Sequence, residues 1–510
     1  MAFSFCRILL KVRCSVAVLL VAVCTMQLLA LPSIAAAQSL PSLGDTEREY
    51  LSPQMERKLG ERIMREIKRN RDYLDDAPVQ EYLESVGNSL LAAKPEARGE
   101  MQYDFFFFVV RDPVLNAFAL PGGYIGVHSG LILAAQTESE LASVLAHEIG
   151  HVAQRHIARM LGNSKQDTLI SLASLILGAL AASASPDAGL GIAMGGQGLA
   201  VQRQLDFSRD AEREADRIGL DILHRAGYET TGMISFFGRL QQASRAYSDA
   251  VPPYLRSHPL TTERMADIEA RTRSFRYRQH ADSADFALIQ ARVRVLQDLS
   301  SQGLRDAADY FQRQLMQNAS PALLGAKYGL AFVALKQGDT ALSQLRVDEA
   351  RAMLKQSFNK PRDVVLDSLG IDIRMASHQY AQAVTEADAA RNAFPFSRGV
   401  AHQYADALIS AGRAEQAADY LRDQIQLYRE DQGAYQLLAK AYSAQGKDAQ
   451  QHMALAEYYA LGGSIPAALD QLSIARRAAD ASFYDLSIID GRERDLRAQR
   501  LEELKQEKGG

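Results

Sequence analysis

Cysteine is scarce in this chain of 510 residues: it has three, Cys6, Cys14 and Cys24, all close to the N terminus. So few cysteines rule out a disulfide scaffold. A strong charge of one sign is also absent, because 57 Lys+Arg stand against 61 Asp+Glu, so nothing indicates a nucleic-acid binder. Apolar residues make up 47% and charged residues 23% of the chain, a balance that excludes a disordered chain, a collagen and a polytopic membrane protein.

A long apolar run occupies residues 15–31, after the basic residues between Arg7 and Arg13 and before the small residues 35–37. This order is typical of a cleaved secretory signal. We therefore expect residues 1–37 to be a signal peptide of bacterial type, which directs the protein to the periplasm. A retained anchor helix is the alternative, but about 17 apolar residues barely span a bilayer core, which takes about 20. Cleavage would leave a mature chain without cysteine.

The region from 38 to 280 mixes predicted helices, strands and glycine-rich loops. Ser52-Pro53 is a helix cap followed by proline in the first helical position, which predicts a helix start. Residues 105–110 form a short apolar run that predicts a buried strand. Residues 116–120 and 124–128 flank Pro121-Gly122-Gly123, which is typical of a hairpin. We expect a mainly α domain with a small β-sheet.

From about residue 285 the chain is rich in Ala, Leu, Tyr, Gln and Arg, with helical periodicity throughout. Expected turn positions recur at spacings of 35, 40, 34 and 34 residues, at Gly303, Gly338, His378, Gly412 and Gly446. This period resembles the tetratricopeptide repeat, a helix–turn–helix unit of about 34 residues. We expect residues 281–510 to form an α-solenoid of such repeats, whose concave surface commonly binds peptide. The alternative is a non-repeating helical domain.

The segment from Thr137 to Val152 predicts a capped helix that carries His147, Glu148 and His151. In it, Thr137 and Glu140 form a capping box. The two histidines are four residues apart and so project from one helical face, where both can bind one Zn²⁺. Glu148 lies beside that face and can act as a general base. The alternative reading is two ordinary helix histidines.

Catalytic zinc normally takes three protein ligands, and a carboxylate-rich segment at residues 208–216 offers the third. Glu212 and Asp216 are four residues apart, so one helical face can supply a ligand and an acceptor for the second N–H of a zinc-bound histidine. Spacing alone does not separate Glu212 from Glu214. The alternative is a charged, exposed helical face.

Three motifs in this order, Asn116–Gly123, His147–His151 and Glu212–Asp216, resemble the zinc metallopeptidase family of the CAAX prenyl proteases and HtpX. The resemblance implies a gluzincin-type metallopeptidase domain with one Zn²⁺ per chain. It also implies that Glu212 is the third ligand and that Asp216 is the matching aspartate. Together with Glu148 as the catalytic base, this predicts a zinc-dependent metalloendopeptidase.

A secretory signal and a repeat tail resemble the periplasmic members of this family that act in outer-membrane β-barrel assembly. That resemblance implies degradation of misfolded or stalled outer-membrane proteins, with the repeats recruiting substrate or the assembly machinery. It also implies that His258 lies over the zinc as a regulatory fourth ligand that keeps the enzyme latent. The alternatives are a chaperone or adaptor for outer-membrane protein assembly with a latent protease site, and a peptidase whose repeats serve oligomerisation.

Four further expectations concern substrate and surroundings. Asn116 positions substrate or caps a turn, and the strand at 124–128 presents a backbone edge to an extended substrate. The apolar and glycine-rich residues 169–198 form a mobile lid that touches a membrane surface, or else a buried core helix with a loop. His128, His156 and His224 are expected to be structural.

Overall fold

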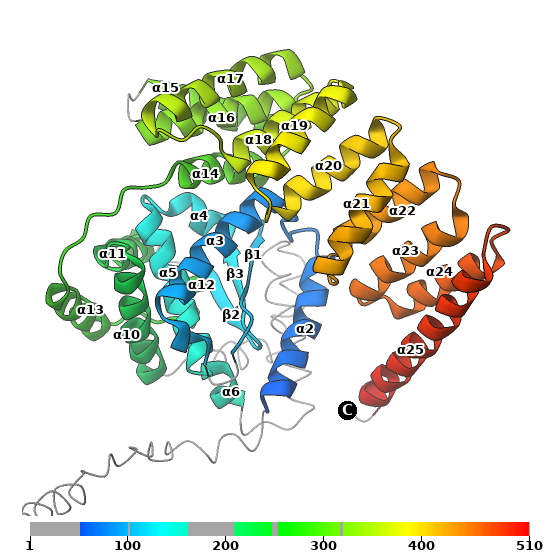
Figure 1. Ribbon diagram of the computed structural model, residues 1–510. Helices are drawn as coiled ribbons and strands as arrows, with labels where there is room; N and C mark the ends of the chain where they lie inside the picture. The colour runs from blue at the N-terminus through cyan, green and yellow to red at the C-terminus, as the bar shows by residue number, and fades with distance from the viewer. Residues whose placement is uncertain (1–51, 100–101, 162–208, 247–252, 317–319, 509–510) are drawn as a thin grey trace, which may run out of the picture. The chain divides into compact units, whose positions relative to one another are not determined.

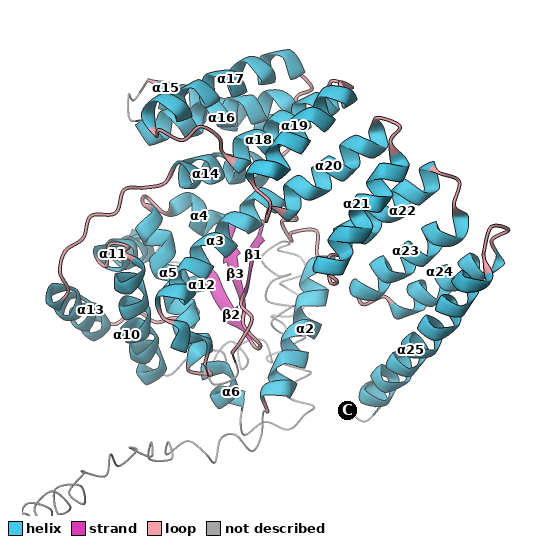
Figure 2. Cartoon of the chain, in the orientation of Figure 1, coloured by secondary structure: helices cyan, strands magenta, loops and turns pink. Residues whose placement is uncertain are grey.

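The computed structural model describes residues 52–99, 102–161, 209–246, 253–316 and 320–508. Figures 1 and 2 show a mainly helical protein with one small sheet, as the sequence predicts. The predicted signal peptide (1–37) and the predicted lid (169–198) lie outside the described residues. Within the part of the chain that the structure describes, no helix is both long and apolar enough to cross a membrane.

The first half of the chain contains the sheet and the helices around it. These elements are α2 (Pro53–Arg69), α3 (Ala77–Ala93), the 3₁₀ helix η2 (Pro95–Arg98), β1 (Phe106–Val110), β2 (Ala117–Leu120), β3 (Tyr124–His128), α4 (Ser129–Ala134), α5 (Glu138–Ala153), α6 (His156–Leu161), α10 (Arg209–Ala226), α11 (Thr231–Ala246), α12 (Pro253–Ser257) and α13 (Thr262–Ser274). The helix start predicted at Ser52-Pro53 is confirmed, since the Ser52 hydroxyl accepts from the Met55 amide at 3.2 Å.

The sheet has the strand order β1-β3-β2, with β1 parallel and β2 antiparallel to β3. The predicted hairpin is therefore β2–β3, and Gly122 and Gly123 in its turn have φ of 80° and 93°, which glycine adopts without steric penalty. Helix α2 packs on one face of the sheet through a small apolar cluster that includes Ile63, Ile67 and Phe108. Alternate strand residues point to the other face, and α3 and α5 cover that face.

The second half of the chain consists of stacked helix pairs. Its helices are α14 (Ala284–Gln297), α15 (Ser301–Leu315), α16 (Ser320–Lys336), α17 (Thr340–Ser357), α18 (Val364–Ala376), α19 (Tyr380–Ala393), α20 (Arg398–Ser410), α21 (Ala414–Leu427), α22 (Gln432–Ala444), α23 (Asp448–Leu461), α24 (Ile465–Arg477) and α25 (Phe483–Lys508). Each helix from α16 onward packs against its neighbours in sequence, which is the arrangement of a solenoid.

The predicted turn positions are confirmed at Gly338, His378, Gly412 and Gly446. All four have a positive φ, between 57° and 84°, and lie between the two helices of a pair. His378 occupies a position that glycine fills in the other pairs, with φ of 57°. The prediction was wrong for Gly303, which lies in the first turn of α15 and donates its amide to the Ser300 hydroxyl. Glycine tolerates a helix start as well as a turn, so its spacing alone is ambiguous there.

One hydrophobic core extends from the sheet and α5 into α14, α16 and α18. Buried Arg292 on α14 donates to both carboxylate oxygens of Asp76, at 2.7 and 2.9 Å, and to the Tyr328 hydroxyl at 2.8 Å. This contact joins the start of α3 to α14 and α16. The boundary at residue 280 between peptidase and repeats therefore stays a prediction.

Candidate metal centre

Helix α5 holds the two motif histidines at the centre of the first half. The Thr137 hydroxyl accepts from the Glu140 amide at 3.2 Å, as predicted. The Glu140 carboxylate does not complete the capping box; it accepts from the Gln136 amide at 2.7 Å and pairs with Arg239. This ion pair ties the start of α5 to α11. The rest of α5 is buried as far as Val152, so the motif is shielded from water.

Helices α5 and α10 cross closely because glycines stand at the contact. A Cβ at Gly150 would lie 2.9 Å from the Ala215 carbonyl oxygen, and one at Gly219 would lie 3.1 Å from that of Ala146. Those distances are shorter than ordinary packing allows, so only glycine permits this approach. The crossing directs Glu212 and Asp216 of α10 at the motif on α5, which resolves the choice that spacing left open between Glu212 and Glu214.

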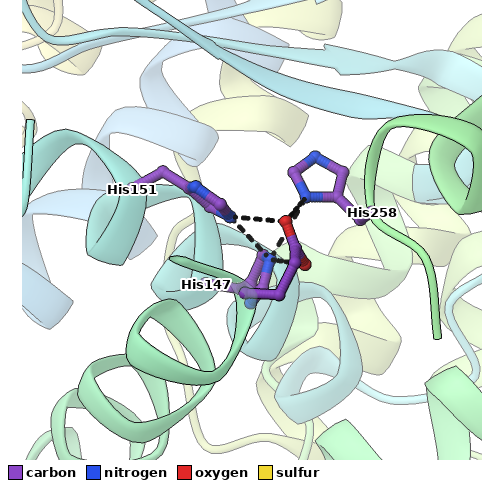
Figure 3. A group of neighbouring side chains, drawn as sticks. His147, His151 and His258 are labelled. Atoms are coloured by element: carbon purple, nitrogen blue, oxygen red, sulfur yellow. Dashed lines mark hydrogen bonds and ion pairs between the residues drawn. The ribbon is translucent and has the colours of Figure 1, made fainter. Parts of the chain in front are cut away.

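Four side chains converge on one point, and Figure 3 shows the three imidazoles among them. They are His147, His151, Glu212 and His258, all at most 2% exposed, and their candidate ligand atoms lie within 4.8 Å of one another. His147 Nε2 is 3.0 Å from His151 Nε2, 3.4 Å from His258 Nδ1 and 3.5 Å from Glu212 Oε2. Glu212 Oε1 is 3.4 Å from His151 Nε2 and 3.0 Å from His258 Nδ1.

These distances fit a tetrahedral zinc site. Donors about 2.1 Å from Zn²⁺ in a tetrahedron are roughly 3.4 Å apart, and the distances given above run from 3.0 to 3.5 Å. Imidazole nitrogens and a carboxylate are ligands that zinc prefers. The donor set therefore fits a single zinc ion, and it includes His258, which sequence spacing by itself would not have selected.

The second nitrogen of His147 faces a carboxylate. His147 Nδ1 is 3.0 Å from Asp216 Oδ1, the arrangement that orients a metal-bound histidine. Arg264 of α13 donates to both oxygens of Asp216, at 2.7 and 2.8 Å. Burial alone would raise the pKa of Asp216, but His147 and Arg264 hold it below its ordinary value. No sequence pattern pointed to Arg264, because only the packing of α13 on α10 brings it here.

Glu148 is completely buried beside the cluster. Neither of its carboxylate oxygens has a hydrogen-bond partner among the described residues. Burial raises the pKa of Glu148, while the histidines and the nearby Ala119 amide oppose that rise. His258 Nε2 is 3.6 Å from Glu148 Oε1, so the His258 ring lies between the ligand set and this carboxylate. The His258 backbone amide donates to the Tyr254 carbonyl oxygen at 2.8 Å, at the end of α12.

His156 contacts the second nitrogen of the other motif histidine. His156 Nδ1 is 2.9 Å from His151 Nδ1, and His156 Nε2 is 3.2 Å from Glu214 Oε2. Glu214 also accepts from Arg159 at 3.0 Å. Burial lowers the pKa of His156 to about 4 despite Glu214, so its ring is neutral at neutral pH. Glu214, the rejected candidate for the third ligand, thus lies behind His156.

Asn116 lies next to the site's sheet rather than in the metal cluster. Its Nδ2 is 3.4 Å from His128 Nε2, and its Oδ1 has no hydrogen-bond partner among the described residues. The expectation that residues 124–128 present a free backbone edge is wrong, because β3 is the central strand and pairs on both sides. The strand with an edge next to the site is β2, which packs against α5.

The geometry can be compared with known proteins. Residues 78–272 match the model of peptidase family M48. The chain therefore carries an M48 zinc metallopeptidase domain, with the metal-binding cluster intact.

The chain is also similar to several whole proteins. The chain is a homologue of the beta-barrel assembly-enhancing protease of Escherichia coli (strain K12), with 28% identity over 92% of this chain and 93% of that protein. It is 35% identical to the putative beta-barrel assembly-enhancing protease of Vibrio cholerae over 61% of this chain, an alignment that spans 64% of that relative. Among solved structures, the TPR domain of P58(IPK) has 12% identity and a TM-score of 0.18, covering 83% of this chain and 99% of that one.

Proposed function

We propose that this protein is a periplasmic zinc metalloendopeptidase that degrades misfolded or stalled outer-membrane proteins. The observation that carries the proposal is the buried cluster of three imidazoles and one carboxylate next to the buried carboxylate of Glu148. The names of its relatives support the link to β-barrel assembly. Their likeness also supports a periplasmic location, which the predicted signal peptide would provide.

In this proposal His147, His151 and Glu212 hold the zinc. The bound zinc would supply Lewis acidity that polarises the scissile carbonyl and acidifies water. Glu148 takes the proton of the attacking water and delivers it to the leaving amine; its burial, which raises its pKa, suits a general base. Asp216, held by Arg264, keeps His147 in the orientation that ligation needs.

Among the described residues β2 is an edge strand of the sheet, and its outer edge suits an extended peptide. The Asn116 carbonyl accepts from the His128 amide at 2.9 Å, so the backbone groups of Asn116 and Phe118 face β3. Backbone groups alternate along an antiparallel pair, which leaves those of Ala117 and Ala119 directed away from β3, and the Ala119 amide lies next to Glu148. A substrate that adds as a strand must expose unpaired backbone. Folded barrels lack such segments, so this geometry favours unfolded or stalled substrates. Asn116, which precedes β2, is the candidate for positioning the substrate at this strand.

His258 makes the described arrangement a latent one. Catalytic zinc sites keep one position open for water, whereas four protein ligands make a closed site. His258 supplies the fourth donor here and also lies against Glu148. Arg264 donates to the Pro259 carbonyl at 2.8 Å and so holds the loop that carries His258. Activity then requires this loop to move away.

The helical repeats are proposed to recruit substrate or the assembly machinery, because solenoids offer extended surfaces for peptide. A closed metal site also supports the second candidate, a chaperone or adaptor for outer-membrane protein assembly whose protease site stays latent. The two candidates differ in whether hydrolysis is needed for the protein's effect on stalled substrates.

The test compares zinc content and degradation of casein, an unfolded protein, by wild type, Glu148→Gln and His258→Ala. Glu148→Gln should bind zinc normally and lose about 10²–10⁴-fold in rate, the usual contribution of a general base. His258→Ala should cleave faster than wild type, because the fourth position opens. Full activity of the Glu148→Gln protein would refute the peptidase mechanism. An unchanged rate for His258→Ala would remove this histidine from any latch.

A further inference from the structure

His156 reaches the metal site because the chain breaks its helix just before it. Helix α5 ends at Ala153, and α6 starts at His156. In a continuous helix two residues five apart point roughly 140° away from each other, so His156 would face away from His151. Arg155 instead has φ of 51°, a left-handed conformation that is unfavourable for a residue with a Cβ.

The strained Arg155 is held in place by a buried partner. Its guanidinium donates to Glu56 Oε2 at 3.1 and 3.0 Å, and the Tyr103 hydroxyl donates to the same oxygen at 2.9 Å. Glu56 is 2% exposed, so this charge-assisted contact is shielded from water. The fold therefore maintains a backbone conformation whose visible consequence is the contact of His156 with His151.

The arrangement of the metal cluster determines which ring nitrogens of His151 and His156 carry a hydrogen atom. His151 directs Nε2 at the other ligand atoms, so its proton is on Nδ1. His151 Nδ1–H then donates to His156 Nδ1, and His156 Nε2–H donates to Glu214. Arg159 completes the chain by donating to the same carboxylate. His147 differs, because its Nδ1 faces the carboxylate of Asp216 directly.

We propose that His156 is a positioning residue for zinc binding: the buried contact between His156 Nδ1 and His151 Nδ1 fixes the tautomer and the ring orientation of His151. Glu214 in turn fixes the tautomer of His156. The inference rests on the proposed ligation of zinc by His151. The neutral imidazole of His156 thus acts on His151 as the Asp216 carboxylate acts on His147.

The test measures zinc affinity of the full chain by competition with a chromophoric chelator, for His156→Ala and His156→Asn. Loss of such an outer partner typically weakens metal binding about 10–100-fold, which is expected for His156→Ala. The Asn side chain can place an acceptor oxygen near the position of Nδ1, so His156→Asn should recover most of that loss. The matched control is His224→Asn on α10, whose ring stacks on Phe275 and which should bind zinc as wild type does.

Cobalt substitution gives a second measurement, because the visible spectrum of bound Co²⁺ reports ligand geometry. His156→Ala should shift that spectrum, and His156→Asn should restore it. Wild-type affinity and spectrum in His156→Ala would overturn the proposal. So would equal losses in the Ala and Asn variants that track a common drop in the thermal stability of the metal-free protein. A wild-type chain that binds no zinc would instead refute the proposed function and, with it, this inference.

Discussion

Alanine at Gly150 should separate α5 from α10 and weaken zinc binding. Its Cβ would lie 2.9 Å from the carbonyl oxygen and 3.0 Å from the Cα of Ala215. Carbon atoms in normal contact are about 3.5–4.0 Å apart, so the helices must separate by roughly half an ångström. Metal–ligand distances tolerate only about 0.2 Å. Glu212, which α10 carries, would therefore leave its position relative to His147 and His151.

The size of the effect on stability follows from two opposing contributions. Overpacking a close contact typically costs about 1–3 kcal/mol, while replacing glycine by alanine within a helix stabilises it by about 0.8–1.0 kcal/mol. The metal-free Gly150→Ala protein should thus lose up to about 2 kcal/mol of unfolding free energy. Gly238→Ala on α11 is the matched control, because a Cβ there meets nothing within 4 Å. It gains the helical contribution without the clash.

The assay combines chemical unfolding of the chelated protein with zinc competition. Gly150→Ala should bind zinc at least about 10-fold more weakly, the lower end of the effect of disturbing a metal site's surroundings. Gly238→Ala should keep wild-type affinity and match or exceed wild-type stability. If Gly150→Ala retained wild-type zinc affinity and were as stable as Gly238→Ala, the close crossing of α5 and α10 would not be what aligns the ligands.

Two further predictions concern pH and metal removal. Burial, and next the facing Asp285, raise the pKa of Asp363 to about 7, so the folded protein keeps a proton that the unfolded chain releases near pH 4. The stability that this bound proton contributes is fully present below about pH 4 and is lost as pH rises through about 7. Asp363→Asn can still cap α18 at the Val365 amide, and its melting temperature should vary less between pH 4.5 and 7.5; an unchanged slope would contradict this. Chelation should lower the melting temperature. Where free zinc was 100 times its Kd, its removal should lower the free energy of unfolding by about 2.7 kcal/mol. Reducing agent should leave the melting temperature unchanged. A melting temperature that falls with reducing agent and not with chelator would refute a cysteine-free mature chain held locally by zinc.

The sequence by itself determined the features that a short segment encodes. The spacing of His147 and His151 places both on one helical face, whatever the rest of the fold does. Pro121-Gly122-Gly123 predicted the hairpin, and a repeat of 34–40 residues predicted the turns at Gly338, His378, Gly412 and Gly446. In each case the physical cause, a helical period or a backbone that must take a positive φ, acts within a few residues.

The tertiary structure decided everything that depends on how segments meet. Glu212 rather than Glu214 faces the histidines because two glycines fix the crossing of α5 and α10. Strand order, which is a long-range property, made β2 the edge and β3 the centre, contrary to the expectation from the sequence. The contact of Arg264 with Asp216 follows only from packing, and the contact of His156 with His151 follows only from the left-handed conformation of Arg155. Periodicity specifies which face a side chain occupies, but only the packing of distant elements specifies what that face meets.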